Sequence, residues 1–159
     1  MIIPILLSSS LFVTSVKDTV WWNTPGGKVT EHRDRNAASC SLTLYNDDGS
    51  VTFEWDDPGK VLVTAVDKKW EFPDTGRMPV AMALGDVWLS NHSGSAIIDA
   101  VGHGHAIGFV ANEEVDDLLR QAGKIVVKTK SVDLTITLTH SKTRVLLSRM
   151  GDCRDSIRK

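Results

Sequence analysis

Apolar and polar residues alternate strictly over two adjacent segments in the first half of the chain. Apolar side chains occupy every second position from Cys40 to Leu44 and again from Val51 to Trp55. A period of two is that of a β-strand with one buried face, and the Asn-Asp-Asp-Gly sequence at 46–49 is typical of a tight turn. The pattern therefore predicts a β-hairpin over residues 40–55, and a third strand with the same period begins at Val61.

Further short strands are predicted along the rest of the chain. Their apolar or alternating segments lie at 78–84, 87–89, 96–101, 106–111, 124–130 and 132–138. Segments rich in Gly, Pro, Asp and Ser separate them, among them Asn91–Ser95, which we expect to form a turn. The polar segment 23–39 has no sustained period and is expected to be a long loop or a ragged edge hairpin that turns at Pro25-Gly26-Gly27.

Two short helices are predicted in the C-terminal half. Apolar residues recur at helical spacing between Val115 and Ala122, after Asn112 as N-cap and before Gly123 as C-terminal stop. A second short helix is expected to begin at Ser141 and to end at Gly151. Many strands with few helices and no helical crossover between the early strands indicate a mainly β fold, an antiparallel β-sandwich or open barrel. Residues 16–159 are expected to form one domain.

The N-terminal segment is apolar from Met1 to Val13. Such a run is typical of the hydrophobic region of a signal peptide, which would comprise residues 1–15 and end at Ser15. The run lacks the usual preceding Lys or Arg, so the alternative is an apolar first strand packed in the core. A retained apolar N-terminus would also suit a subunit that docks through it on another protein.

The two cysteines, Cys40 and Cys153, bear on whether the protein is exported. In an oxidising compartment they would pair as one disulfide that fastens the C-terminal segment to an early strand. In the cytosol they would remain two separate, buried free thiols. The pairing is our prediction, together with a periplasmic or secreted location.

Composition and charge exclude several classes of protein. The 159 residues carry a net charge of −2, which is unlike the basic surface of nucleic-acid-binding proteins. No run of about 18 apolar residues is present, so no transmembrane helix is expected. Two cysteines cannot form a four-cysteine zinc site.

The candidate chemistry centres on the sequence Gly-His-Gly-His at 102–105. His103 and His105 would point to one side of a strand, as metal ligands do, with His92 or Asp99 as a third ligand. A small hydrolase or metal-dependent enzyme centred on this pair is the alternative function, whereas a flexible hairpin tip or bulge with solvated imidazoles is the simpler interpretation. No nucleophile elbow and no phosphate-binding loop occurs, so we predict no catalytic residue and no cofactor.

Five tryptophans accompany a single tyrosine. Trp55 and Trp70 occupy inward-facing strand positions and are expected in the core. Trp21 and Trp22 are consecutive and would face opposite sides of a strand, so one of them would be exposed for contact with a partner or a sugar ring. The alternative is that the polar loop after Trp22 covers it.

The order of elements resembles the invasion-associated locus B family. The similarity lies in Cys40-Ser41-Leu42 before a turn, in Pro79-Val80-Ala81, and in the run from Phe109 through the helix into 124–138. It implies a small exported β-sandwich-like protein of the cell envelope or host surface, and no catalytic residues. We accordingly predict a non-enzymatic, extracytoplasmic module that binds or assists another protein, with the hydrolase or metal enzyme and the docked subunit as alternatives.

Overall fold

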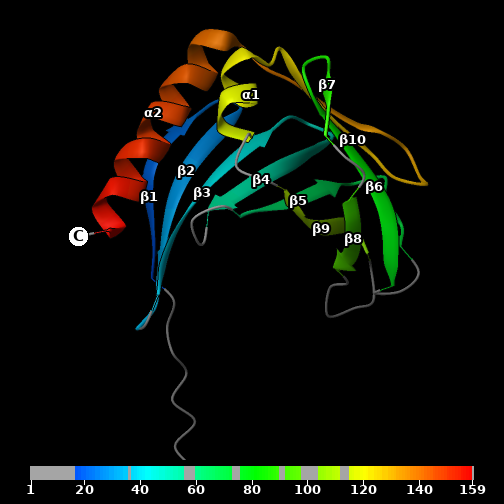
Figure 1. Cartoon of the computed structure of the whole chain (residues 1–159), viewed down its shortest axis with the longest axis horizontal. Coiled ribbons are helices and arrows are strands. Elements are labelled where there is room, and N and C mark those ends of the chain that lie inside the picture. Colours follow the sequence, from blue (N-terminus) through cyan, green and yellow to red (C-terminus); the bar gives the residue numbers. More distant parts are fainter. Residues whose placement is uncertain are drawn as a thin grey trace, which may run out of the picture.

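A computed structural model describes residues 17–35, 37–55, 60–72, 76–89, 92–97, 104–111 and 115–158. This part of the chain is mainly antiparallel β-structure with two helices, as predicted (Figure 1). The elements are, in chain order, β1 (Lys17–Thr24), β2 (Gly27–Arg33), β3 (Ala38–Tyr45), β4 (Gly49–Trp55), β5 (Val61–Asp67), β6 (Arg77–Leu84), β7 (Val87–Trp88), β8 (His92–Ile97), β9 (Ala106–Ala111), α1 (Val115–Gln121), β10 (Lys124–Lys128), β11 (Leu134–Thr137) and α2 (His140–Ile157).

The strands form one open sheet in the order β1-β2-β3-β4-β5-β9-β8-β6-β10-β11, and β7 pairs with β6. The hairpin predicted at residues 40–55 is confirmed as β3 and β4, in which Leu42 lies opposite Phe53. The sheet curls, so that β11 returns towards β4. The Asn46 side-chain amide beside β4 donates a hydrogen bond to the Thr135 carbonyl oxygen of β11 at 2.9 Å. The curl encloses the core.

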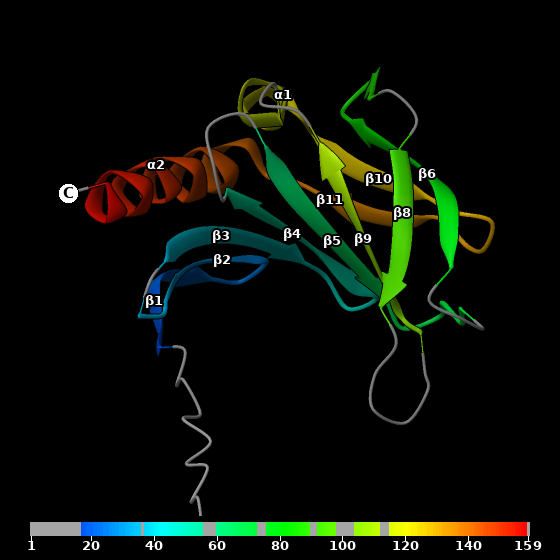
Figure 2. The same ribbon diagram turned by 60° about the horizontal axis from the view of Figure 1, so that its bottom comes forward.

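The sheet has an inner and an outer face. Figure 2 shows both helices on one side of strands β2 to β5, while no helix of the described chain covers the other side. We call the helix-covered side the inner face and the opposite side the outer face. The core lies on the inner face and includes Leu42, Phe53, Val63, Met82, Ile107, Leu119, Ile125 and Leu146. Trp55 and Trp70 are buried there, as predicted.

The segment expected to be a loop or an edge hairpin is a hairpin. β1 and β2 pair antiparallel around a turn at Gly26, whose φ of 93° favours glycine. Trp21 forms a β-bulge, because the pairing shifts register between Val20 and Trp22. The expectation that the two consecutive tryptophans face opposite sides is therefore wrong, because the bulge turns both towards the inner face. Trp21 packs against the core, and Cζ of Arg149 on α2 lies 4.7 Å from the centroid of the Trp22 ring.

Part of the predicted turn at Asn91–Ser95 is a strand instead. Residues from His92 onward form β8, which pairs with β6 and β9. The serines at 93 and 95 are exposed on the outer face, which explains their polarity. Gly94 faces the core, where a Cβ would lie 2.6 Å from Cγ2 of Val80, so its glycine allows close packing and does not mark a turn.

The C-terminal helix is longer than predicted. α2 runs through Gly151 to Ile157, because Met150 and Cys153 on either side of the glycine are buried and hold the helix against the sheet. This packing outweighs the helix-breaking tendency of one glycine, which amounts to about 1 kcal/mol. α1 forms where predicted, while Asn112 lies outside the described residues.

We expect the substitution Gly151→Ala to raise the free energy of unfolding by about 0.5–1 kcal/mol. A Cβ at this exposed helical position would meet nothing within 4 Å. Urea unfolding of the variant measures the effect. Gly49→Ala is the matched control with the opposite sign, because its Cβ would collide with the Val66 carbonyl oxygen. A loss of stability in Gly151→Ala would contradict the description of α2.

The predicted disulfide between Cys40 and Cys153 is confirmed. It joins β3 to α2 with a Cα–Cα distance of 6.2 Å, and both cysteines are 0% exposed. The apolar run Met1–Val13 lies outside the described residues. No helix in the described part of the chain is long and apolar enough to cross a lipid bilayer.

A buried carboxylate lies next to this disulfide. Glu31 pairs with Cys40 across β2 and β3 and is 9% exposed. Arg33 Nε donates to its Oε1 at 2.7 Å and Trp21 Nε1 donates to its Oε2 at 2.8 Å. These hydrogen bonds, that of Arg33 first, lower the pKa of Glu31 below its ordinary value of 4.5.

Glu31 should therefore stabilise the fold at neutral pH and lose this effect in acid. Its contribution is fully present above pH 4.5 and disappears as the pH falls through the lowered pKa of the folded state. We expect Glu31→Gln to cost about 1–3 kcal/mol of unfolding free energy at neutral pH and less in acid. Urea unfolding over a pH series checks this. Glu71→Gln, at an exposed carboxylate, is the control; a pH-independent cost at Glu31 would contradict the assignment.

Candidate functional site

Apolar side chains gather on the outer face of β5, β9 and β8. Leu62 lies opposite Val110, and Val66 lies opposite Ala106, which in turn pairs with Ile97. We call these five residues the outer patch. Leu62 is 41% exposed, Ile97 48% and Val110 54%, so three neighbouring strands each present one large apolar side chain to solvent. Isolated exposed apolar residues are common, whereas contiguous groups mark contact surfaces.

Most of the remainder of the outer face is polar, as expected for the solvent side of an antiparallel sheet, although Val20 on the edge strand β1 is 57% exposed there. On β3 and β4 the hydroxyls of Thr43 and Thr52 hydrogen-bond across the strands at 3.0 Å. Beside them, Ser39 donates to Glu54 Oε1 at 2.6 Å. The outer patch therefore lies beside a largely polar surface on β3 and β4 and is a feature of three neighbouring strands.

A hydrogen-bonded Asp-His-Ser network crosses the outer face near the sheet edge. Nδ1 of His32 lies 2.8 Å from Oδ1 of Asp18, and Nε2 of the same ring lies 2.8 Å from Oγ of Ser41. The order of groups is that of a serine hydrolase triad. Sequence reasoning missed it, because the three residues come from β1, β2 and β3 and only the strand register brings them together.

The surroundings of Ser41 give this network a structural role. Ser41 is 3% exposed, so a substrate carbonyl has no access to its hydroxyl. It pairs with Thr30 on one side and Glu54 on the other, so the backbone N–H groups around it serve the sheet and are unavailable to an oxyanion. The network ties the edge strand β1 to β3.

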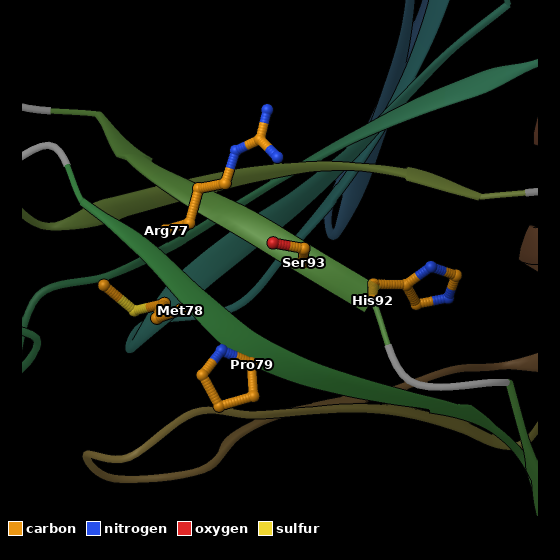
Figure 3. A pocket seen from close by; sticks show the side chains of 5 residues that line it. All are labelled: Arg77, Met78, Pro79, His92 and Ser93. Atoms are coloured by element: carbon orange, nitrogen blue, oxygen red, sulfur yellow. The ribbon is translucent and has the colours of Figure 1, made fainter.

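A shallow cavity of about 340 Å³ lies between β6 and β8 and is lined by Arg77, Met78, Pro79, His92 and Ser93 (Figure 3). The His92 ring is stacked on that of Phe109, with the two ring centroids 5.1 Å apart. Burial lowers the pKa of the His92 imidazole. Its Nε2 is buried without a hydrogen-bond partner among the described residues. Figure 3 shows this ring directed away from the Arg77 guanidinium, so the polar groups do not converge on one ligand.

The predicted histidine pair is only half described. Nδ1 of His105 is hydrogen-bonded to the backbone carbonyl of Trp70, whereas His103 and Asp99 lie outside the described residues. Within the described ranges no group of three or more His, Cys, Asp or Glu side chains could hold a metal ion. A metal site at His103 and His105 therefore stays a prediction.

The most exposed tryptophan is one that the sequence did not single out. Trp88 on β7 is 51% exposed, and Nζ of Lys128 lies 5.1 Å from its ring centroid. Trp22 is 37% exposed, and Trp21 is half-buried, with its indole N–H donating a hydrogen bond to the Glu31 carboxylate. The aromatic surface predicted at Trp21 and Trp22 is thus partly occupied by Arg149 and Glu31.

Comparison with known proteins gives no further guide to these surfaces. No protein-family model matches the chain, and no curated protein or solved structure matches it significantly.

Proposed function

We propose that this protein is a non-enzymatic, extracytoplasmic module that binds another protein through the outer patch. The observation that carries the proposal is the exposure of Leu62, Val110 and Ile97 on three neighbouring strands of a sheet face that no described element covers. Leu62 and Val110 lie opposite each other, and Ile97 lies two rows further along the sheet with its side chain beside Gly108 of the row between. Burying such side chains at an interface gains about 25 cal/mol per Å² of apolar surface. Their strands are held by the core, so the surface is formed before a partner arrives.

The disulfide supports an extracytoplasmic location. Disulfides persist in oxidising environments such as the periplasm and the extracellular space, and the Cys40–Cys153 bond is enclosed in the core. The resemblance to the invasion-associated locus B family agrees with export. If the apolar run is a signal peptide that ends at Ser15, protein purified from its native source should begin at Val16. A native N-terminus at Met1 would refute the cleavage.

Site-specific photo-crosslinking tests the binding surface. We expect a benzophenone amino acid in place of Val110 to form covalent adducts with a protein in the native source, because this residue lies on β9, the middle strand of the outer patch, and is 54% exposed. The same probe at Val145, which is 44% exposed on α2, is the matched control and should form few adducts. Equal labelling at both positions, or none at Val110, would refute the proposal.

A further inference from the structure

We propose that the exposed face of α2 docks on a membrane surface rich in anionic phospholipids. This face is separate from the outer patch, so the inference goes beyond the proposed function and does not depend on it. It follows from the charges of the helix, from the apolar side chains among them and from the place of α2 in the fold.

The charge of α2 is opposite in sign to that of the chain. The helix contains four Lys or Arg residues and two Asp residues, whereas the whole chain carries a net charge of −2. Both aspartates follow Met150, so the first half of the helix carries Lys142, Arg144 and Arg149 and no acidic residue. The helix dipole favours acidic residues near the start of a helix, so helix stability does not account for Lys142 and Arg144.

These cations are available to an anionic partner. Lys142 and Arg144 are exposed and take part in none of the ion pairs of the described chain. Arg149 Nη1 lies 3.1 Å from Oδ2 of Asp152, but both side chains of this pair are about half exposed. Ion pairs in solvent contribute little, so Arg149 can exchange this partner for a lipid phosphate.

The exposed face of α2 has a central strip with basic flanks. Ser141, Val145 and Ser148 are exposed and project from one side of the helix, since they are four and three residues apart. At 3.6 residues per turn, Lys142 and Arg144 lie on opposite flanks of this strip. The short side chains of the strip allow the helix to approach a headgroup layer while the long basic side chains on both flanks reach the phosphates.

Two apolar side chains are exposed among these charges and favour a lipid over a purely polar anion. Val145 is 44% exposed, and Trp22 of β1 is 37% exposed with its ring centroid 4.7 Å from Cζ of Arg149. Tryptophan is enriched at the headgroup level of membranes, where its apolar body and its polar N–H are both satisfied. A sulfated polysaccharide would use the cations alone, whereas a membrane surface would use the cations together with Trp22 and Val145.

The position of α2 permits this contact. Figures 1 and 2 show α2 at the periphery of the fold, with the strands β1 to β3 on one side of it and no described element on the other. A helix of 18 residues is about 27 Å long and offers an elongated surface. The outer patch lies on the face of the sheet opposite to the helices, so docking through α2 leaves it uncovered for its protein partner.

Cosedimentation of the full, oxidised chain with lipid vesicles tests the inference. Vesicles of phosphatidylcholine with about one quarter phosphatidylglycerol are compared with vesicles of phosphatidylcholine alone. The apolar run Met1–Val13 would bind both kinds of vesicle alike, so the ratio of the two partition coefficients reports the effect of charge. We expect a ratio of at least about tenfold in about 0.1 M salt and a fall to near one in about 0.5 M salt.

Charge reversal locates the contact. The double variant Lys142→Glu with Arg144→Glu should lower the ratio to below about twofold, because each cation near an anionic surface contributes about fivefold. This variant should fold, since glutamates are favourable near the start of a helix, and thermal unfolding by circular dichroism verifies it. The matched control, Lys60→Glu with Arg77→Glu, changes the net charge equally at exposed positions outside α2 and should keep the ratio within about twofold of the wild type.

Three results would overturn docking through α2. One is a wild-type ratio near one in dilute salt. Another is an equal loss in both double variants, which would show that only the net charge matters. The third is binding to the sulfated polysaccharide heparin without binding to anionic vesicles, which would show that the cations of α2 serve a polar anion.

Discussion

Replacing Cys153 by alanine is expected to lower the free energy of unfolding by about 2–5 kcal/mol. The disulfide closes a loop with a sequence separation of 113 residues, so its removal greatly increases the freedom of the unfolded chain. In the folded state the end of α2 loses its covalent attachment to β3. Urea unfolding followed by circular dichroism would measure the loss.

The helix as a whole should survive this change. Leu146, Leu147 and Met150 remain buried, and Arg154 Nη1 keeps its ion pair with Asp116 Oδ2 of α1 at 3.0 Å. We therefore expect hydrogen exchange to accelerate at the C-terminal end of α2 and little elsewhere. The double variant Cys40→Ala with Cys153→Ala controls for the free thiol and should unfold as the single variant does. Equal stability of oxidised and reduced wild type would contradict the argument.

Local pattern was sufficient to predict most elements of the fold. The alternation at 40–55 fixed both the hairpin and the inward side of each strand, because only one face of the sheet is buried. The C-terminal end of α2 was not predicted, because a glycine such as Gly151 commonly ends a helix. The helix continues because Cys153 packs against β3, a contact between segments far apart in the sequence. For the same reason Ser93-Gly94-Ser95 read as a turn, although Gly94 packs against Val80.

The outer patch could not be recognised from the sequence. In β5, Val61 and Val63 are buried while Leu62 between them is exposed, so the segment is apolar on both faces. A continuous apolar run is equally typical of a strand buried on both sides. Which face lacks a cover depends on the placement of α1 and α2, and that placement is set by contacts between distant segments. The Asp18-His32-Ser41 network escaped prediction because it depends on strand register.

Replacing Trp70 by alanine is expected to cost about 3–5 kcal/mol of unfolding free energy. The side chain is 0% exposed, its ring centroid lies 5.5 Å from that of Phe72, and its indole Nε1 donates to the Val132 carbonyl at 2.6 Å. It thereby joins the segment after β5 to the loop between β10 and β11. Trp70→Phe keeps an aromatic ring and loses the hydrogen bond, so we expect a smaller loss, about 1–3 kcal/mol.

Trp88→Ala is the matched control for this experiment, because it removes the same side chain from a position that is 51% exposed. Its cost should be below about 1 kcal/mol, since little buried surface and one cation–π contact with Lys128 are lost. Urea unfolding of the three variants ranks them. If Trp70→Ala were no more destabilising than Trp88→Ala, the closure of the sheet would not depend on Trp70. The curl that brings β11 to β4 would then rest on the burial of Leu134 and Ile136 and on the hydrogen bond from Asn46 to the Thr135 carbonyl oxygen.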